Sequence, residues 1–167
     1  MQNSLRALAL VLPAVLFACN KHDEAPEQAG EHAEESGHTH EPLIEGGSLI
    51  ELGDHEANLE VHLDAETGEL VIYLVDGHAS DYVRSTQVAL AVTVQPAAGD
   101  PYALTLAQVA STLSGEKVGD SSKYQIQDDR LKGVAELHGK VASVSMKGST
   151  YANVEFAWPA GEHDHDH

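Results

Sequence analysis

Apolar and polar residues alternate most clearly in "ANLEVHLD" (57–64), which is typical of a strand with one buried face. The segment "ELVIYLV" (69–75) follows after "AETG" (65–68), a four-residue loop ending in glycine. Joined as a hairpin, the apolar pairs would be Leu63 with Leu70, Val61 with Ile72, and Leu59 with Leu74. A slip by one residue would move these side chains to the opposite face, so the pattern predicts one register. Because 69–75 also has apolar residues on its other face, we expect it to be an interior strand.

Further short segments have strand character and are separated by Gly-Asp and Lys-Gly turns. They are 47–52, 87–95, 101–108, 123–127, 140–146 and 150–158. The stretch 128–137 predicts one or two helical turns at most. Many short strands with regular turns favour an all-β fold, a small antiparallel sandwich of the immunoglobulin-like kind over residues 43–158. A partly closed barrel is the alternative.

Residues 1–18 have the character of a secretory signal peptide, with Arg6 before an apolar run that is too short to span a bilayer. Leu16-Phe17-Ala18-Cys19 resembles a bacterial lipobox. The resemblance implies cleavage before Cys19 and acylation of this only cysteine, and two or more acyl chains give a stable membrane anchor. Asn20, in place of aspartate, implies the outer membrane facing the periplasm rather than the inner membrane. The alternative is an ordinary signal peptide that leaves a free thiol.

The two ends differ in composition from the middle of the chain. Residues 20–42 carry seven acids and four histidines but no large apolar side chain, so 19–42 is predicted to be a disordered, lipidated tether. Residues 159–167 form a similar tail. Without Arg6 the chain has eight basic against 27 acidic residues, a net charge of −19. This charge argues against nucleic-acid binding and favours cationic partners and a soluble monomer.

Histidines and carboxylates in the two arms have the spacing of flexible metal ligands. His-X-His on a mobile chain can turn two imidazoles to one Zn²⁺, Cu²⁺ or Ni²⁺ ion, and neighbouring carboxylates can add oxygen. The candidate ligands are His163, His165, His167, Asp164 and Asp166 in the tail, and His32, His38, His40 and Glu41 in the tether. Without preformed geometry, such sites are expected to be weak and exchangeable. The alternative is a solvating segment whose histidines bind metal only opportunistically.

Within the predicted domain, Asp54 and His55 lie in one turn and His78 follows Asp76-Gly77 in another. These three side chains would form a second metal site if the two turns met, although surface histidines more often face solvent. Catalytic motifs are not evident. "HEANLEVH" has Leu59 where a zinc-protease motif needs histidine, and its strand periodicity is incompatible with the helix of that motif. We therefore expect no enzymatic activity.

Residues 45–79 resemble a module of the bacterial envelope through Gly46-Gly47, Leu52-Gly53-Asp54, Gly68 and the "YLVDG" of 73–77. Similar patterns occur in small exported lipoproteins and in the accessory region of periplasmic adaptor subunits of heavy-metal efflux pumps. The resemblance implies a location near metal traffic and efflux components as partners. Relatives usually begin the pattern with His-Gly-Gly, whereas this chain has Glu45.

Two functions follow as hypotheses. The first is a membrane-anchored lipoprotein that binds divalent transition metals weakly through its arms, as a buffer or for hand-over to an efflux system. The second is a non-enzymatic interaction module that docks an envelope or efflux partner, with the arms as solvated linkers. A small-molecule site within the β domain is a weaker third option.

Overall fold

The computed structural model describes residues 40–161, and this region is all-β and antiparallel, as expected. Its strands are β1 (Ser48–Leu52), β2 (Ala57–Asp64), β3 (Glu69–Asp76), β4 (Ala89–Pro96), β5 (Tyr102–Gln108), β6 (Lys123–Gln127), β7 (Leu137–Met146) and β8 (Ser149–Trp158). A single 3-10 turn, η1 (Asp129–Leu131), is the helical part of these residues. None of the described residues belongs to a helix long and apolar enough to cross a membrane.

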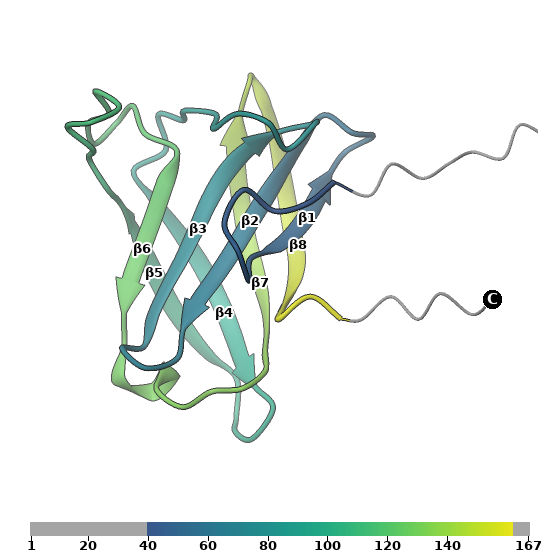
Figure 1. Ribbon diagram of the computed structural model, residues 1–167, viewed down its shortest axis with the longest axis vertical. Helices are drawn as coiled ribbons and strands as arrows, with labels where there is room; N and C mark the ends of the chain where they lie inside the picture. The colour runs from purple at the N-terminus through teal and green to yellow at the C-terminus, as the bar shows by residue number, and fades with distance from the viewer. Residues whose placement is uncertain (1–39, 162–167) are drawn as a thin grey trace, which may run out of the picture. The chain divides into compact units, whose positions relative to one another are not determined.

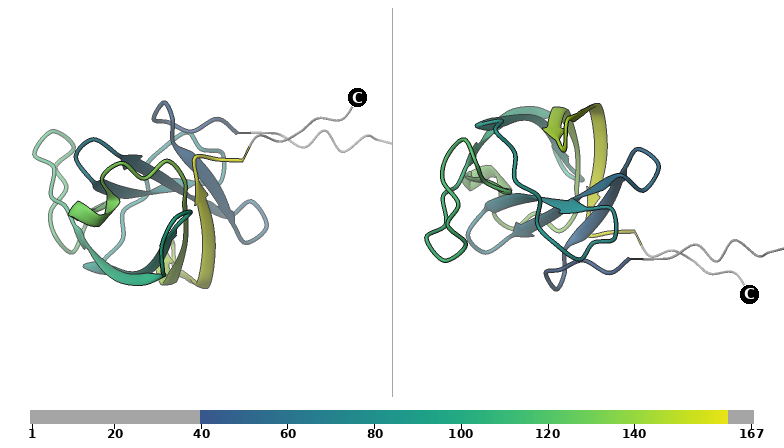
Figure 2. Two further views of the ribbon diagram at one scale, coloured as in Figure 1. Left: turned by 90° about the horizontal axis from the view of Figure 1, so that it is seen from below. Right: turned by 90° about the horizontal axis from the view of Figure 1, so that it is seen from above.

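The eight strands form one sheet in the order β1-β2-β3-β6-β5-β4-β7-β8, and all neighbours are antiparallel. The sheet curls until its edge strands β1 and β8 lie side by side (Figures 1 and 2). Opposite walls therefore pack against one another across a single core. The expected antiparallel fold is confirmed, in its partly closed form.

Two side-chain hydrogen bonds hold the two edges of the sheet together. Trp158 Nε1 donates to the Gly46 carbonyl oxygen at 3.0 Å, and Tyr151 Oη donates to Glu56 Oε2 at 2.6 Å. Between these contacts, β1 and β8 border an open groove of about 510 Å³. We call this join between β1 and β8 the seam.

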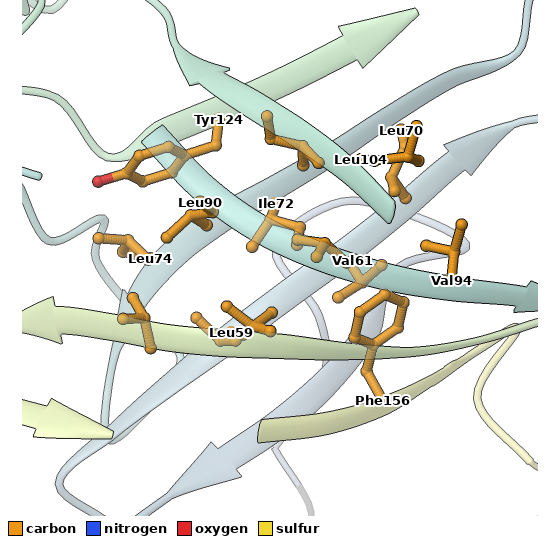
Figure 3. Close-up of a cluster of buried hydrophobic side chains, with 14 of the residues drawn as sticks. Leu59, Val61, Leu70, Ile72, Leu74, Leu90, Val94, Leu104, Tyr124 and Phe156 are labelled. Atoms are coloured by element: carbon orange, nitrogen blue, oxygen red, sulfur yellow. The ribbon is translucent and has the colours of Figure 1, made fainter. Parts of the chain in front are cut away.

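The β2–β3 hairpin has the predicted register, with Leu63 opposite Leu70, Val61 opposite Ile72 and Leu59 opposite Leu74. All six side chains are buried in the core, together with residues of β4, β5, β6 and β8 (Figure 3). Strand β3 pairs with both β2 and β6, so its expected interior position is also confirmed.

The stretch 128–137 follows its prediction only in part. Asp128 caps η1 by accepting from the Arg130 backbone N–H at 2.9 Å, and the Arg130 guanidinium beside it lowers the pKa of this carboxyl to about 2. However, Leu137 belongs to β7, which begins three residues before the predicted strand at 140–146. The Leu137 side chain is fully buried, and Leu137 pairs with Trp158 of β8. Both contacts explain why β7 extends this far.

The two sides of the curled sheet are covered differently. On β4 and β5 the outward residues are small and exposed, for example Ala91, Thr93 and Thr105. On β2 and β3 the outward residues Asn58, Glu60 and Val75 are buried. Another segment must therefore cover the outer face of β2 and β3.

Candidate functional site

Residues 40–47, which we call the strap, pass across the outside of β2 before β1 begins (Figure 1). The Ile44 backbone N–H donates to Glu60 Oε1 at 2.6 Å, and Gly47 N–H donates to the Ile44 carbonyl at 3.0 Å. A Cβ at position 47 would lie 2.9 Å from Glu60 Oε1, so glycine makes room for the carboxylate. The Gly46-Gly47 pattern thus has a local structural cause.

Glu60 is a fully buried acid on the outer face of β2. Burial raises its pKa, and the backbone N–H groups of Ile44 and Leu43 oppose this effect. Its Oε2 atom has no hydrogen-bond partner among residues 40–161. Burying an acid with a hydrogen bond to only one of its two oxygens is unfavourable, so holding the strap through Glu60 lowers the stability of the fold.

His40, at the start of the strap, lies beside His78 in the loop that follows β3. Their ring centroids are 6.1 Å apart and the ring planes meet at 68°. His78 is exposed and His40 is partly exposed, so both rings are accessible to ions. Sequence analysis placed His40 in the tether and His78 in a domain site, and the structure brings these two histidines together.

The loop carrying His78 is fixed by the Asp76 side chain. Asp76 Oδ1 accepts from the backbone N–H groups of Ser80 at 2.7 Å and Asp81 at 3.1 Å, while Ser80 Oγ donates to Oδ2 at 3.0 Å. Burial acts to raise the pKa of Asp76, but these hydrogen bonds together outweigh it, and the pKa of this carboxyl is lowered. Gly77 packs so closely on the His55 carbonyl that a side chain would collide with it.

The predicted domain site is therefore only partly assembled. The turns that carry His55 and His78 do meet, through Gly77. However, the His55 side chain turns to Glu51, with Nδ1 and Oε2 3.2 Å apart, and Asp54 is exposed. Within residues 40–161, no three His, Cys, Asp or Glu side chains converge as a metal-ligand group, so Asp54, His55 and His78 do not form a closed site.

The other histidines of the domain lie elsewhere on the sheet. His62 is on the outer face of β2, and His138 is exposed on β7, where it lines a groove with Glu155 and Phe156. Glu41, next to His40, is exposed. Cys19, His32, His38, His163, Asp164, His165, Asp166 and His167 lie outside the described residues, as do the predicted signal peptide and most of both arms.

Sequence reasoning missed the strap and the role of Glu60, although one signal was present. In the predicted register, the polar face of β2 carries Asn58, Glu60 and His62, whereas the same face of β3 carries Val71 and Tyr73. Apolar residues beside polar ones on one face indicate that another segment covers it. The residues that cover it, 40–47, lie across the predicted boundary between the tether and the domain, with Leu43 and Ile44 as their only large apolar side chains.

Comparisons with known proteins add no function. No protein-family model matches the chain, and no curated protein or solved structure is significantly similar to it. Any functional proposal therefore depends on the residues themselves.

Proposed function

We propose that this chain is an exported, lipid-anchored envelope protein that binds divalent transition-metal ions through its histidine- and acid-rich arms. The β domain serves as a rigid scaffold, and the protein buffers metal or hands it to an efflux system. The observation that carries this proposal is the placement of the two chain ends. The Trp158–Gly46 hydrogen bond joins the residues just before β1 to the end of β8, and the described part of the chain begins and ends on the same side of the domain (Figure 2).

This placement matters because weak ligands gain affinity from a high local concentration. Seven of the eleven histidines lie in residues 20–42 and 159–167, and these segments adjoin the two joined chain ends. Imidazoles from both arms can therefore act on one ion without a long chain closure. The net charge of −18 further concentrates cations around the protein.

Calorimetric titration of the mature chain with Zn²⁺, Cu²⁺ and Ni²⁺ tests the proposal. We expect binding in the micromolar range that is largely lost when the arm histidines are replaced by asparagine. These are His22, His32, His38, His40, His163, His165 and His167. The control variant carries His62→Asn and His138→Asn in the sheet and should keep its binding. Equal binding by the arm variant and the control would overturn the proposal.

Lipid attachment at Cys19 is a separate part of the proposal, supported by the lipobox-like sequence before it. Wild-type protein expressed with its leader is expected to partition into a detergent phase. The Cys19→Ser variant should stay in the aqueous phase. Equal partitioning of the two proteins would contradict acylation at this residue.

The interaction module is the second candidate, and exposed apolar residues in the β5–β6 loop favour it. Leu113 is fully exposed and Val118 is 60% exposed, so this loop offers apolar side chains that a partner could cover. Under this alternative, replacing the arm histidines leaves binding to a purified efflux adaptor unchanged, whereas Leu113→Ser weakens it. Under the metal-binding proposal, replacing the arm histidines removes metal binding, whereas Leu113→Ser leaves metal binding unchanged.

A further inference from the structure

We propose that His40 and His78 bind one divalent transition-metal ion between them, which clips the start of the strap to the loop after β3. The inference takes its class of ligand from the proposed function and adds a fixed position on the domain. It also gives the metal a structural consequence, because the ion would join the membrane-side arm to the β scaffold.

The ring geometry is close to that of two imidazoles that share an ion. With metal–nitrogen bonds of about 2.0–2.1 Å, the centroids of two coordinating imidazoles lie roughly 5–6 Å apart. The His40 and His78 centroids are 6.1 Å apart, and their planes are inclined by 68° rather than stacked face to face. At this separation the two rings are within reach of a common ion.

His78 provides the rigid half of the site. Three hydrogen bonds from Ser80 and Asp81 to the Asp76 carboxylate fix the loop, and Ala79 N–H donates to the Asp76 carbonyl at 3.1 Å. Gly77 is wedged against the His55 carbonyl. Ordering this ligand therefore costs little on metal binding, unlike a ligand on a flexible arm.

His40 provides the adaptable half. It lies four residues before Ile44, whose N–H is held by the buried Glu60 carboxylate. The chain is therefore anchored to the sheet near His40 while the imidazole itself remains partly exposed. Glu60 acts as a positioning residue for this ligand and has no contact with the ion.

The donor set determines which ions fit. Two imidazole nitrogens favour Cu²⁺, Ni²⁺ and Zn²⁺ over Mg²⁺ and Ca²⁺, which prefer oxygen, and Cu²⁺ binds such donors most tightly. Water or the adjacent Glu41 carboxylate is available for the remaining positions. Two protein ligands make an exchangeable site, which is suited to transfer rather than storage.

The test uses paramagnetic Cu²⁺ and nuclear magnetic resonance on the full mature chain labelled with ¹⁵N. Substoichiometric Cu²⁺ is expected to broaden the backbone amide signals of residues 76–81 and 40–44. In His78→Asn, broadening at 76–81 should disappear and the Cu²⁺ affinity of this site should fall about tenfold or more, because a chelate becomes a single ligand. His138→Asn, which alters an exposed histidine of β7, should leave the broadening unchanged.

A double-substitution cycle checks that the two histidines act as one unit. His40→Asn and His78→Asn should each remove the site, and the double variant should show little additional loss. If Cu²⁺ binds the protein while the amides of 76–81 stay sharp, the clip is overturned and the wider proposal stands. If neither wild-type protein nor any variant binds Cu²⁺, both are overturned.

Discussion

Glu60 shows how a single residue can be unfavourable for stability and still determine local structure. Its carboxylate is fully buried and one oxygen lacks a partner among the described residues, yet the other oxygen holds the strap through Ile44. Burial raises the pKa of Glu60, so the folded protein binds the carboxyl proton more tightly than the unfolded chain does. Its contribution to stability is then greatest below the ordinary carboxyl pKa and is lost as pH rises through the raised value.

Replacing Glu60 by glutamine removes this pH dependence while keeping an oxygen acceptor for Ile44. The free energy of unfolding of Glu60→Gln minus that of wild type should therefore increase as pH rises from 4 to 8. Urea unfolding at several pH values measures the difference. Glu155→Gln is the control with the opposite sign, because Lys140 lowers the pKa of Glu155 and that pair stabilises only when the carboxylate is ionised. A difference that does not change with pH would contradict the buried state of Glu60.

At the scale of elements, the pairing of β7 with β8 depends on one glycine. Gly139 lies opposite Phe156, and the Phe156 ring occupies the space that a Cβ of residue 139 would take. The ring is almost completely buried in the core. Strand β7 can therefore run through this position only with glycine, which extends the strand toward Leu137.

Gly139→Ala is expected to destabilise the fold by about 1–3 kcal/mol, the usual effect of overpacking a core. The Phe156 ring would have to leave its position, because the added methyl group cannot be accommodated beside it. Gly161→Ala is the matched control, since a Cβ there meets nothing within 4 Å. Denaturant unfolding of both variants gives the comparison, and equal midpoints would show that the ring can be displaced without loss.

At the scale of the whole molecule, the seam determines how the sheet closes. The edges β1 and β8 are joined by the Trp158–Gly46 and Tyr151–Glu56 hydrogen bonds and border a groove between these contacts. Edge strands that lack continuous pairing open more readily than the centre of a sheet. The seam is therefore the place where the fold should open first.

Trp158→Phe removes the indole donor to Gly46 and is expected to cost about 1–2 kcal/mol. The effect should be local. Amide hydrogen exchange in β1 should become faster, whereas exchange in β6 and β5, the two strands farthest from both edges in the order of the sheet, should change little. Uniform acceleration across all strands would instead show that the seam opens only with global unfolding.

Local patterns in the sequence predicted the strands and the hairpin, which depend on neighbouring residues. The alternation in 57–64 and 69–75 was sufficient for strand bounds, loop length and register. The order of the strands was not predictable in this way, because β3 pairs with β6 and β4 with β7 across long stretches of chain. The same alternation fits two separate layers and one curled sheet equally well.

The candidate site was less predictable for a related reason. His40 and His78 are far apart in sequence and meet only because the strap folds back over β2. Leu43 and Ile44 are the first large apolar residues after the polar segment, but they do not reveal which face of the sheet residues 40–47 cover. Glu60 stands on the polar face of a regularly alternating strand, and only the apolar neighbours on β3 indicate that this face is covered.

Because Trp158 and Gly46 are hydrogen-bonded, the fold should tolerate a different order of its strands along the chain. Since residues 46 and 158 already touch, a short glycine-rich linker could join these two positions in a version of the domain without the segments beyond them, and new ends could be opened in the exposed β5–β6 loop near Gly115. Such a circular permutant would keep every strand pair. It would also lack residues 40–45, so the Glu60 carboxylate would lose its partner at Ile44.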